Sequence, residues 1–171
     1  FHSANTFDPN ANPALQGGTE GATMRFRPES SDGPNRGLDV AVRRLGNFIS
    51  THPWAENISI ADLWTKAATS AIKVTGGPDI PVESGRLDFP TQQGERNIQV
   101  PPNGRVTSPA MNLSQLRANF RRMGFSDKEM VVLSGAHTLG QAHRNISNHE
   151  GRWTQDNTQF NNSYFKNLIN E

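Results

Sequence analysis

The spacing of apolar residues constrains the fold of this chain more than any other feature of its sequence. Between Gly37 and Ile49 the apolar residues recur at intervals of three and four, which places them on one face of a helix. Similar stripes cover residues 63–74, 113–123 and the run after Ser126, and another begins at Tyr164. No useful stretch shows the period-two alternation of a half-buried strand. The sequence therefore predicts an all-α fold.

Short motifs mark where several of these helices begin and end. Ser59 with Asp62 resembles a capping box with Asp in place of Glu, and Ser126 with Glu129 forms a regular one. Gly76-Gly77-Pro78 supplies a glycine that can end a helix and a proline that prevents its continuation. Gly124 is placed to end the helix before Ser126.

Two long segments have no helical pattern. Residues 3–36 are rich in Gly, Pro, Asn and Ser, and residues 79–110 are rich in proline and glycine, so both are predicted to be loops. A chain of 171 residues is long enough for one domain with a substantial core. Long loops within a compact helical domain usually have a function, often that of enclosing a ligand. We therefore predict a single domain over residues 1–171.

Both ends of the chain suggest a portion of a longer protein. The first residues, Phe1-His2, include no initiating Met, and the last, Leu168-Ile-Asn-Glu171, stop within an amphipathic pattern. We expect the domain to be truncated at both ends.

Charge and cysteine content narrow the classes of function. The formal net charge is +1 and like charges form no long run, so we expect neither a nucleic-acid nor a membrane partner. The chain contains no cysteine, which excludes disulfides and thiolate chemistry and favours a reducing compartment. Four Asn-x-Ser sequons favour secretion instead, and the compartment is left open. The sequons begin at Asn57, Asn112, Asn145 and Asn161.

The apolar run from Met130 to His143 carries an ionisable side chain, His137, in its middle. Such a histidine has three plausible uses: a structural hydrogen bond, ligation of a metal or haem, or base catalysis. The small residues Gly135 and Ala136 precede it and would leave room for a flat macrocycle. His137 and His143 stand six apart, rather than four as in zinc-binding helices. Haem iron needs only one protein ligand, so these details favour haem.

The segment Val-Leu-Ser-Gly-Ala-His-Thr-Leu-Gly, residues 132–140, resembles the proximal-histidine signature of the plant, fungal and bacterial haem peroxidase superfamily. Further matches follow in the same order along nearly the whole chain. They include Phe1-His2-Ser3, Pro34-Asn35-Arg36-Gly37-Leu38, Gly85-Arg86-Leu87-Asp88 and Glu150-Gly151-Arg152-Trp153-Thr154. The cysteine-free ascorbate and cytochrome c peroxidase branch is the most similar. The resemblance implies the haem peroxidase fold, comprising the distal helical part and the start of the proximal part.

The resemblance also assigns the central roles. His137 matches the proximal ligand of the haem iron, His2 the distal base, and Asn35 the residue that accepts a hydrogen bond from that base. The family's distal arginine would precede Phe1 by three residues, and the aspartate that accepts from the proximal histidine would lie past Glu171. Both therefore fall outside the chain.

Further residues match the surroundings of a haem. Phe1 matches the distal aromatic residue, and His143 the residue that binds a haem propionate. Ile146 replaces the arginine with which ascorbate peroxidases bind ascorbate, which argues against that donor. Trp64 and Trp153 are expected in the core. A proximal K⁺ or Ca²⁺ site, which would use hard oxygen ligands, is predicted at Thr138, Thr154, Asp156 and Asn161.

These matches predict a haem b enzyme in which hydrogen peroxide oxidises the iron and an unidentified one-electron donor restores it. One alternative is a haem protein of the same fold with other chemistry, because the distal arginine is outside the chain. A second alternative is a binding or structural relative that has lost haem.

Overall fold

The computed structural model describes residues 1–90 and 100–170, and within them the protein is helical with no strand. The first half contains α1 (His2–Asn5), α2 (Asp39–Thr51) and α3 (Ile60–Val74). The second half contains α4 (Leu113–Arg122), α5 (Asp127–Ser134), α6 (Arg144–Ser147) and α7 (Ser163–Asn170). Isolated bridges pair Gly21 with Asp88 and Ala142 with Gly151. The predicted all-α fold is confirmed.

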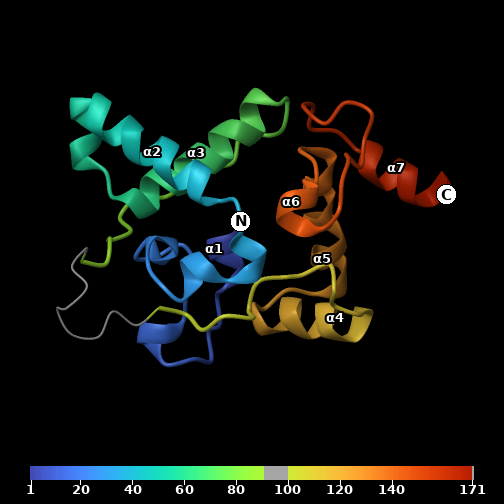
Figure 1. Cartoon of the computed structure of the whole chain (residues 1–171), viewed down its shortest axis with the longest axis horizontal. Helices are drawn as coiled ribbons and strands as arrows, with labels where there is room; N and C mark the ends of the chain where they lie inside the picture. The colour runs from blue at the N-terminus through green and yellow to red at the C-terminus, as the bar shows by residue number, and fades with distance from the viewer. Residues whose placement is uncertain (91–99, 171) are drawn as a thin grey trace.

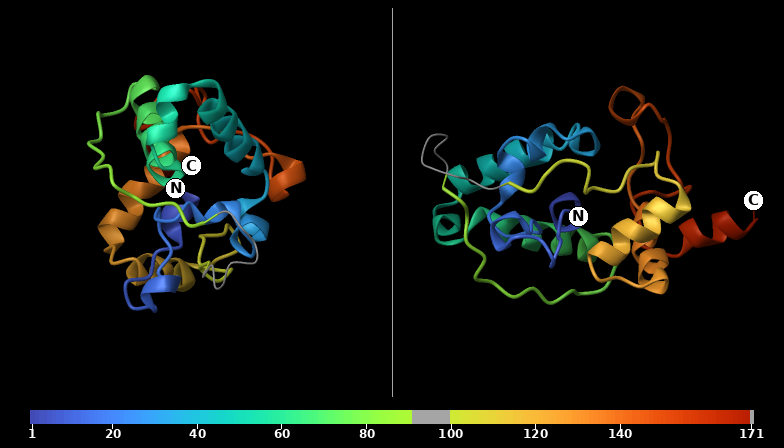
Figure 2. Two further views of the ribbon diagram at one scale, coloured as in Figure 1. Left: turned by 90° about the vertical axis from the view of Figure 1, so that its left-hand side faces the viewer. Right: turned by 90° about the horizontal axis from the view of Figure 1, so that it is seen from below.

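Short 3₁₀ helices supplement these α-helices. They are η1 (Pro13–Leu15), η2 (Thr23–Arg25), η3 (Glu29–Ser31), η4 (Gly33–Asn35), η5 (Pro53–Asn57) and η6 (Gly135–Thr138). Figure 1 shows α2 and α3 side by side on one side of the molecule and α4, α5 and α7 on the other. The N-terminus and α1 lie between these two groups, and Figure 2 shows the same separation from below.

The two helices on the first side begin and end close to where the sequence predicts. Ser59 caps α3 by accepting a hydrogen bond from the backbone N–H of Asp62 at 3.1 Å. The prediction that Asp62 completes a capping box with Ser59 is wrong. The Asp62 carboxylate instead accepts from the Gly85 N–H at 2.7 Å and from Arg86 Nη1 at 2.9 Å. These contacts lower the pKa of Asp62, the Gly85 N–H most. Asp62 therefore anchors the segment after α3 rather than the helix that carries it.

The end of α3 is a Schellman motif, as the glycine pair predicts. Gly76 has φ of +91°, and the Gly77 N–H donates to the Ile72 carbonyl at 2.9 Å. This turn redirects the chain into the segment that contains Arg86.

On the second side, capping boxes start both α4 and α5. The box of Ser126 and Glu129 was predicted, whereas the box of Asn112 and Gln115 was not. The two helices pack through a small apolar cluster of Phe120, Met123 and Met130.

The helix that starts at Ser126 is shorter than predicted. It ends at Ser134, and His137 lies on the 3₁₀ helix η6 that continues it. The Gly135 N–H donates to the carbonyls of Val132 and Leu133, which shows the tightening common in a last helical turn. Leu139 is then extended and ends the helical run. His137 is therefore placed by a helix end rather than by a helix interior.

The predicted loops are confirmed in part. Residues 3–36 contain most of α1 and four 3₁₀ turns, more helical structure than expected. Residues 79–90 and 100–110 contain no helix, and residues 91–99 of that predicted loop lie outside the described residues. None of the described helices combines the length and apolar character needed to cross a lipid bilayer.

Candidate active site

The two residues predicted to act on the distal side, His2 and Asn35, are in contact. His2 Nδ1 lies 2.9 Å from Asn35 Oδ1, and Asn35 Nδ2 donates to the backbone carbonyl of Glu29 at 2.9 Å. Since the amide nitrogen of Asn35 already donates to Glu29, its oxygen faces the imidazole and accepts from Nδ1–H. This places the proton of a neutral His2 on Nδ1 and leaves Nε2 with a free lone pair.

The surroundings of His2 favour its neutral form. Burial lowers the pKa of His2, and the hydrogen bond with Asn35 opposes that shift. A neutral imidazole with a free Nε2 can take up a proton at neutral pH, which is what a general base requires.

Glu29 is a distal residue that the sequence did not indicate. Its side chain is 2% exposed, its Oε1 accepts from the Ser3 hydroxyl at 3.3 Å, and its backbone carbonyl holds Asn35. Burial raises the pKa of Glu29, and neighbouring hydroxyl groups, including that of Ser3, oppose the shift. Glu29 thus contacts both the residue after His2 and the partner of His2. It lies in a segment without periodicity, so only the tertiary contacts reveal it.

On the second side of the molecule, His137 is held by a backbone carbonyl and two aromatic rings. Its Nδ1 lies 2.9 Å from the Ser134 carbonyl oxygen. Its ring stands edge-on to Trp153 with centroids 4.6 Å apart, and Tyr164 lies 5.3 Å away. Since a carbonyl can only accept, Nδ1 carries the proton and Nε2 is free to ligate a metal.

The surroundings of His137 differ in part from expectation. A Cβ at Gly135 would lie 2.8 Å from Phe165 Cε2, so the space next to this glycine is filled by α7. Trp153 is 41% exposed and contacts His137, so it is not a core residue. Trp64, also expected in the core, is partly buried and lines a cavity.

Phe1 and His143 remain exposed in this structure. Phe1 stands edge-on to His2 with ring centroids 5.8 Å apart. His143 lies just before α6, and among the described residues its imidazole has no hydrogen-bond partner. Both side chains are thus free to contact a ligand.

The residues of the predicted cation site are neighbours, but most of them satisfy one another. The buried Thr138 hydroxyl donates to Asn161 Oδ1 at 3.1 Å, and the buried Thr154 hydroxyl donates to the Thr138 carbonyl at 2.9 Å. The Asp156 carboxylate accepts from the Thr158 hydroxyl at 2.6 Å and from its N–H, which lowers the pKa of Asp156. Within the described residues, no three His, Asp or Glu side chains form a metal-binding group.

A cavity of about 410 Å³ opens beside His2. Its walls come mainly from apolar residues of α2 and α3, and Phe1 and His2 also line it. No residue of α5 or η6 lines it, so it reaches only one of the two histidines.

The Peroxidase family model matches residues 1–171, the whole of the chain. The chain belongs to the peroxidase family. This confirms the resemblance carried by the motifs around His2, Asn35 and His137.

Fungal members of the peroxidase family share extensive identity with the chain. A protein of Cryptococcus neoformans named as a heme-binding peroxidase is 45% identical over 153 residues, covering 90% of this chain and 48% of that protein. One of Pyricularia oryzae with the same name is 41% identical over 171 residues, covering 100% and 53%. The mitochondrial cytochrome c peroxidase of Emericella nidulans is 42% identical over 171 residues, covering 100% and 44%. The chain therefore spans about half the length of the curated peroxidases it matches.

Proposed function

We propose that the protein is a haem-dependent peroxidase, an oxidoreductase that reduces hydrogen peroxide at the expense of a one-electron donor. The observation that carries the proposal is the chain of contacts from Glu29 through Asn35 to His2. It fixes the tautomer of His2 and presents a free basic nitrogen, which is the group that peroxide chemistry requires. The fungal relatives named as heme-binding peroxidases support the same activity.

The proton transfers follow from the tautomer of His2. Of the two oxygens of hydrogen peroxide, we call the one that would face the haem iron the near oxygen and the other the far oxygen. His2 Nε2 takes the proton of the near oxygen, and Asn35 Oδ1 stabilises the positive charge of the imidazolium by accepting from Nδ1–H. As the O–O bond breaks, Nε2 returns the proton to the far oxygen, which leaves as water. The near oxygen becomes the second water when it receives two protons and two electrons, and the donor would supply these electrons through bound haem. Because the same nitrogen acts first as base and then as acid, its pKa must lie near the working pH.

On the proximal side, His137 is the residue that would hold a haem. Its Nε2 would ligate the iron, and within the described residues its Nδ1–H donates to the Ser134 carbonyl, which restrains the ring. Bound haem supplies the redox-active iron that passes electrons to peroxide. The chain offers no cysteine for a thioether link, which supports haem b. We assign Phe1 to the distal face of the haem and His143 to a propionate.

The proximal cation site is a separate proposal. The hydroxyls of Thr138 and Thr154, the Asn161 amide and the nearby Asp156 provide hard oxygen atoms of the kind that K⁺ or Ca²⁺ prefers. A bound ion would replace the hydrogen bonds that now join these groups.

For the electron donor, we propose a redox protein rather than ascorbate. The relative in Emericella nidulans is named a cytochrome c peroxidase, and Ile146 offers no charge for ascorbate. The exposed indole of Trp153 provides an oxidisable side chain in contact with His137.

The test is the reaction of the haem-loaded protein with peroxide, followed by its oxidation of reduced cytochrome c. His2→Leu should slow the peroxide reaction by about 10²- to 10⁴-fold, the usual contribution of a general acid–base group, and leave haem bound. His149→Leu changes an exposed histidine and is the matched control.

Three results of this test would contradict the proposal. Failure to develop a Soret band on loading would favour the relative without haem. A Soret band without a peroxide reaction would favour a haem protein of the same fold with other chemistry. A rate unchanged in His2→Leu would exclude His2 as the base.

A further inference from the structure

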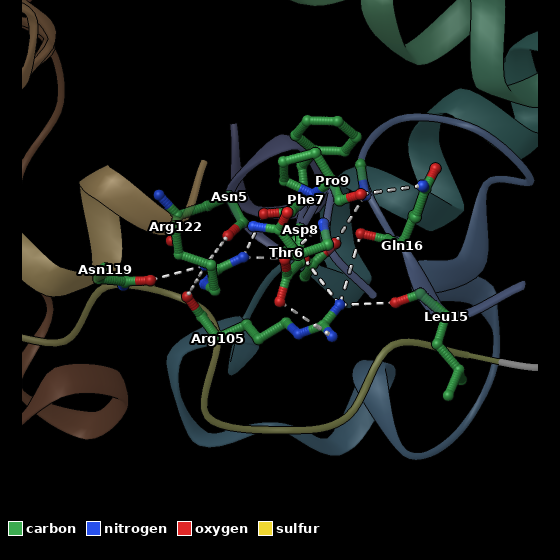
Figure 3. Close-up of polar contacts among 12 residues, drawn as sticks. Asn5, Thr6, Phe7, Asp8, Pro9, Leu15, Gln16, Arg105, Asn119 and Arg122 are labelled. Carbon is green, nitrogen blue, oxygen red and sulfur yellow. Dashed lines mark hydrogen bonds and ion pairs between the residues drawn. The ribbon is translucent and has the colours of Figure 1, made fainter. Parts of the chain in front are cut away.

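Two arginine side chains converge on the backbone just after α1, the helix that carries His2 (Figure 3). Arg122 comes from the last turn of α4, and Arg105 from the segment that precedes α4. Both are partly buried. Neither belongs to any motif that the sequence indicated.

Arg122 donates hydrogen bonds to several backbone carbonyl groups at the end of α1. Its Nη2 donates to the Asn5 carbonyl at 2.8 Å, and its Nη1 donates to the carbonyls of Thr6, at 3.2 Å, and Phe7. The Asn119 amide oxygen, on the same helix, accepts from Nη2 at 2.6 Å and orients the guanidinium. Three successive carbonyls after His2 thus face one cation.

Arg105 acts on the same stretch from a second direction. Its Nη1 donates to the Thr6 carbonyl at 3.1 Å and to the Leu15 carbonyl at 2.6 Å. The Asp8 carboxylate lies 3.6 Å from its Nη2. The backbone carbonyl of Arg105 also accepts from Arg122 Nη2 at 2.9 Å, so the two arginines form one unit.

Helix ends leave carbonyl groups without intrahelical partners, and cations near that end are favourable. At the end of α1 two guanidiniums satisfy these groups. Arginine suits this position, because its planar fork holds several acceptors in fixed directions. The Asn5 side chain adds a further restraint by accepting from the Thr107 N–H at 2.7 Å.

We propose that Arg122 and Arg105 are positioning residues for His2, which act by clamping the carbonyls of Asn5, Thr6 and Phe7 to α4. The clamp joins the segment that bears His2 to the helix pair α4–α5, which leads directly into η6 and His137. It therefore sets the placement of one imidazole relative to the other. The catalytic part of this inference rests on the proposed peroxidase function.

The placement matters because proton transfer requires close geometry. A displacement of about 1 Å from a change far from the chemistry can cost roughly a hundredfold in rate. Removing the clamp should loosen α1 and shift His2 without touching either histidine.

The test compares Arg122→Gln with Arg121→Gln in the full-length, haem-loaded protein. Arg121 is the adjacent residue on α4 and is exposed, with its guanidinium 3.4 Å from Asp127. We expect Arg122→Gln to slow the peroxide reaction by about 10- to 100-fold, to shift the NMR titration midpoint of His2, and to speed amide hydrogen exchange in residues 3–8. Arg121→Gln should stay within about twofold of wild type in rate, as expected of an exposed site.

A conservative variant provides a second test of the clamp if Arg122→Gln does not fold. Arg122→Lys retains the charge but not the fork, so it should give an intermediate rate and intermediate exchange. If Arg122→Gln and Arg122→Lys both match Arg121→Gln in exchange and in the His2 titration, the clamp does not position His2. Exchange and titration need no peroxidase activity, so they decide the clamp even if the proposed function fails.

Discussion

The distal and proximal segments hold their histidines in different ways. His2 is half-buried, and its Asn35 partner is fixed by Glu29, so a series of described contacts determines its tautomer. His137 is exposed and depends on one backbone carbonyl, with Trp153 and Tyr164 against its ring. In both cases an acceptor oxygen on Nδ1 leaves Nε2 free, but the acceptor of His2 is a side chain from a distant segment, whereas that of His137 is a backbone carbonyl three residues away.

The largest expected effect tests the proximal half of that comparison. His137→Ala should abolish the histidine-ligated haem spectrum and reduce the peroxide reaction to background, because it removes the residue that we propose as the iron ligand. His143→Ala should retain iron ligation, since we assign that residue to a propionate. Absorption spectra of the loaded variants give the result. A normal histidine-ligated spectrum in His137→Ala would place the ligand elsewhere.

The next effect tests the distal half. Asn35→Ala removes the acceptor of His2 Nδ1–H, and the loss of one such hydrogen bond, ~1.4 kcal/mol, corresponds to about a tenfold slower peroxide reaction. Since Asn35 raises the pKa of His2, its removal should lower that pKa further. The acid limb of the pH–rate profile should therefore move to lower pH. An unshifted acid limb would show that Asn35 does not act on His2.

Two glycine substitutions, one in each region, should change the free energy of unfolding in opposite directions. Gly135→Ala places a methyl group against Phe165 and should lower the free energy of unfolding by about 1–3 kcal/mol. Gly46→Ala, in the exposed middle of α2 where an added Cβ meets nothing within 4 Å, should raise it by about 0.5–1 kcal/mol. Urea unfolding measures both. Equal effects would mean that α7 does not pack on η6 as described.

The smallest expected effect is a pH dependence of the free energy of unfolding that comes from Glu29. Burial raises its folded pKa above its ordinary value of 4.5, so the folded state binds more protons than the unfolded state. The resulting stability is fully present below pH 4.5 and is lost as pH rises through the folded pKa. Glu29→Gln should remove this slope, and unfolding of the two proteins compared across the acid range measures it. If the free energies of unfolding of the two proteins run parallel as pH changes, the Glu29 carboxyl titrates normally in the folded state.

Much of this architecture could be predicted, because its signals are local. Helical periodicity located α2, α3 and α4 to within a few residues, and Ser126 with Glu129 marked the start of α5. The site residues were predicted through family resemblance, and the contact between His2 and Asn35 agrees with it. The end of α5 was missed, since it depends on η6 and its packing against α7.

The sequence by itself determined the helical class, the caps and the kinds of side chain available for chemistry, because these depend on neighbours within a few residues. Only the tertiary structure decided the proton position on His2, the burial of Glu29, the contact of Trp153 with His137 and the clamp of Arg105 and Arg122. These features depend on residues far apart in the chain, and the periodic pattern of apolar residues does not indicate which distant residues are in contact. The physical reason is that contacts between distant segments form only once the helices have packed, and the polar groups brought together there, such as Asn35 and the two guanidiniums, then pair with one another.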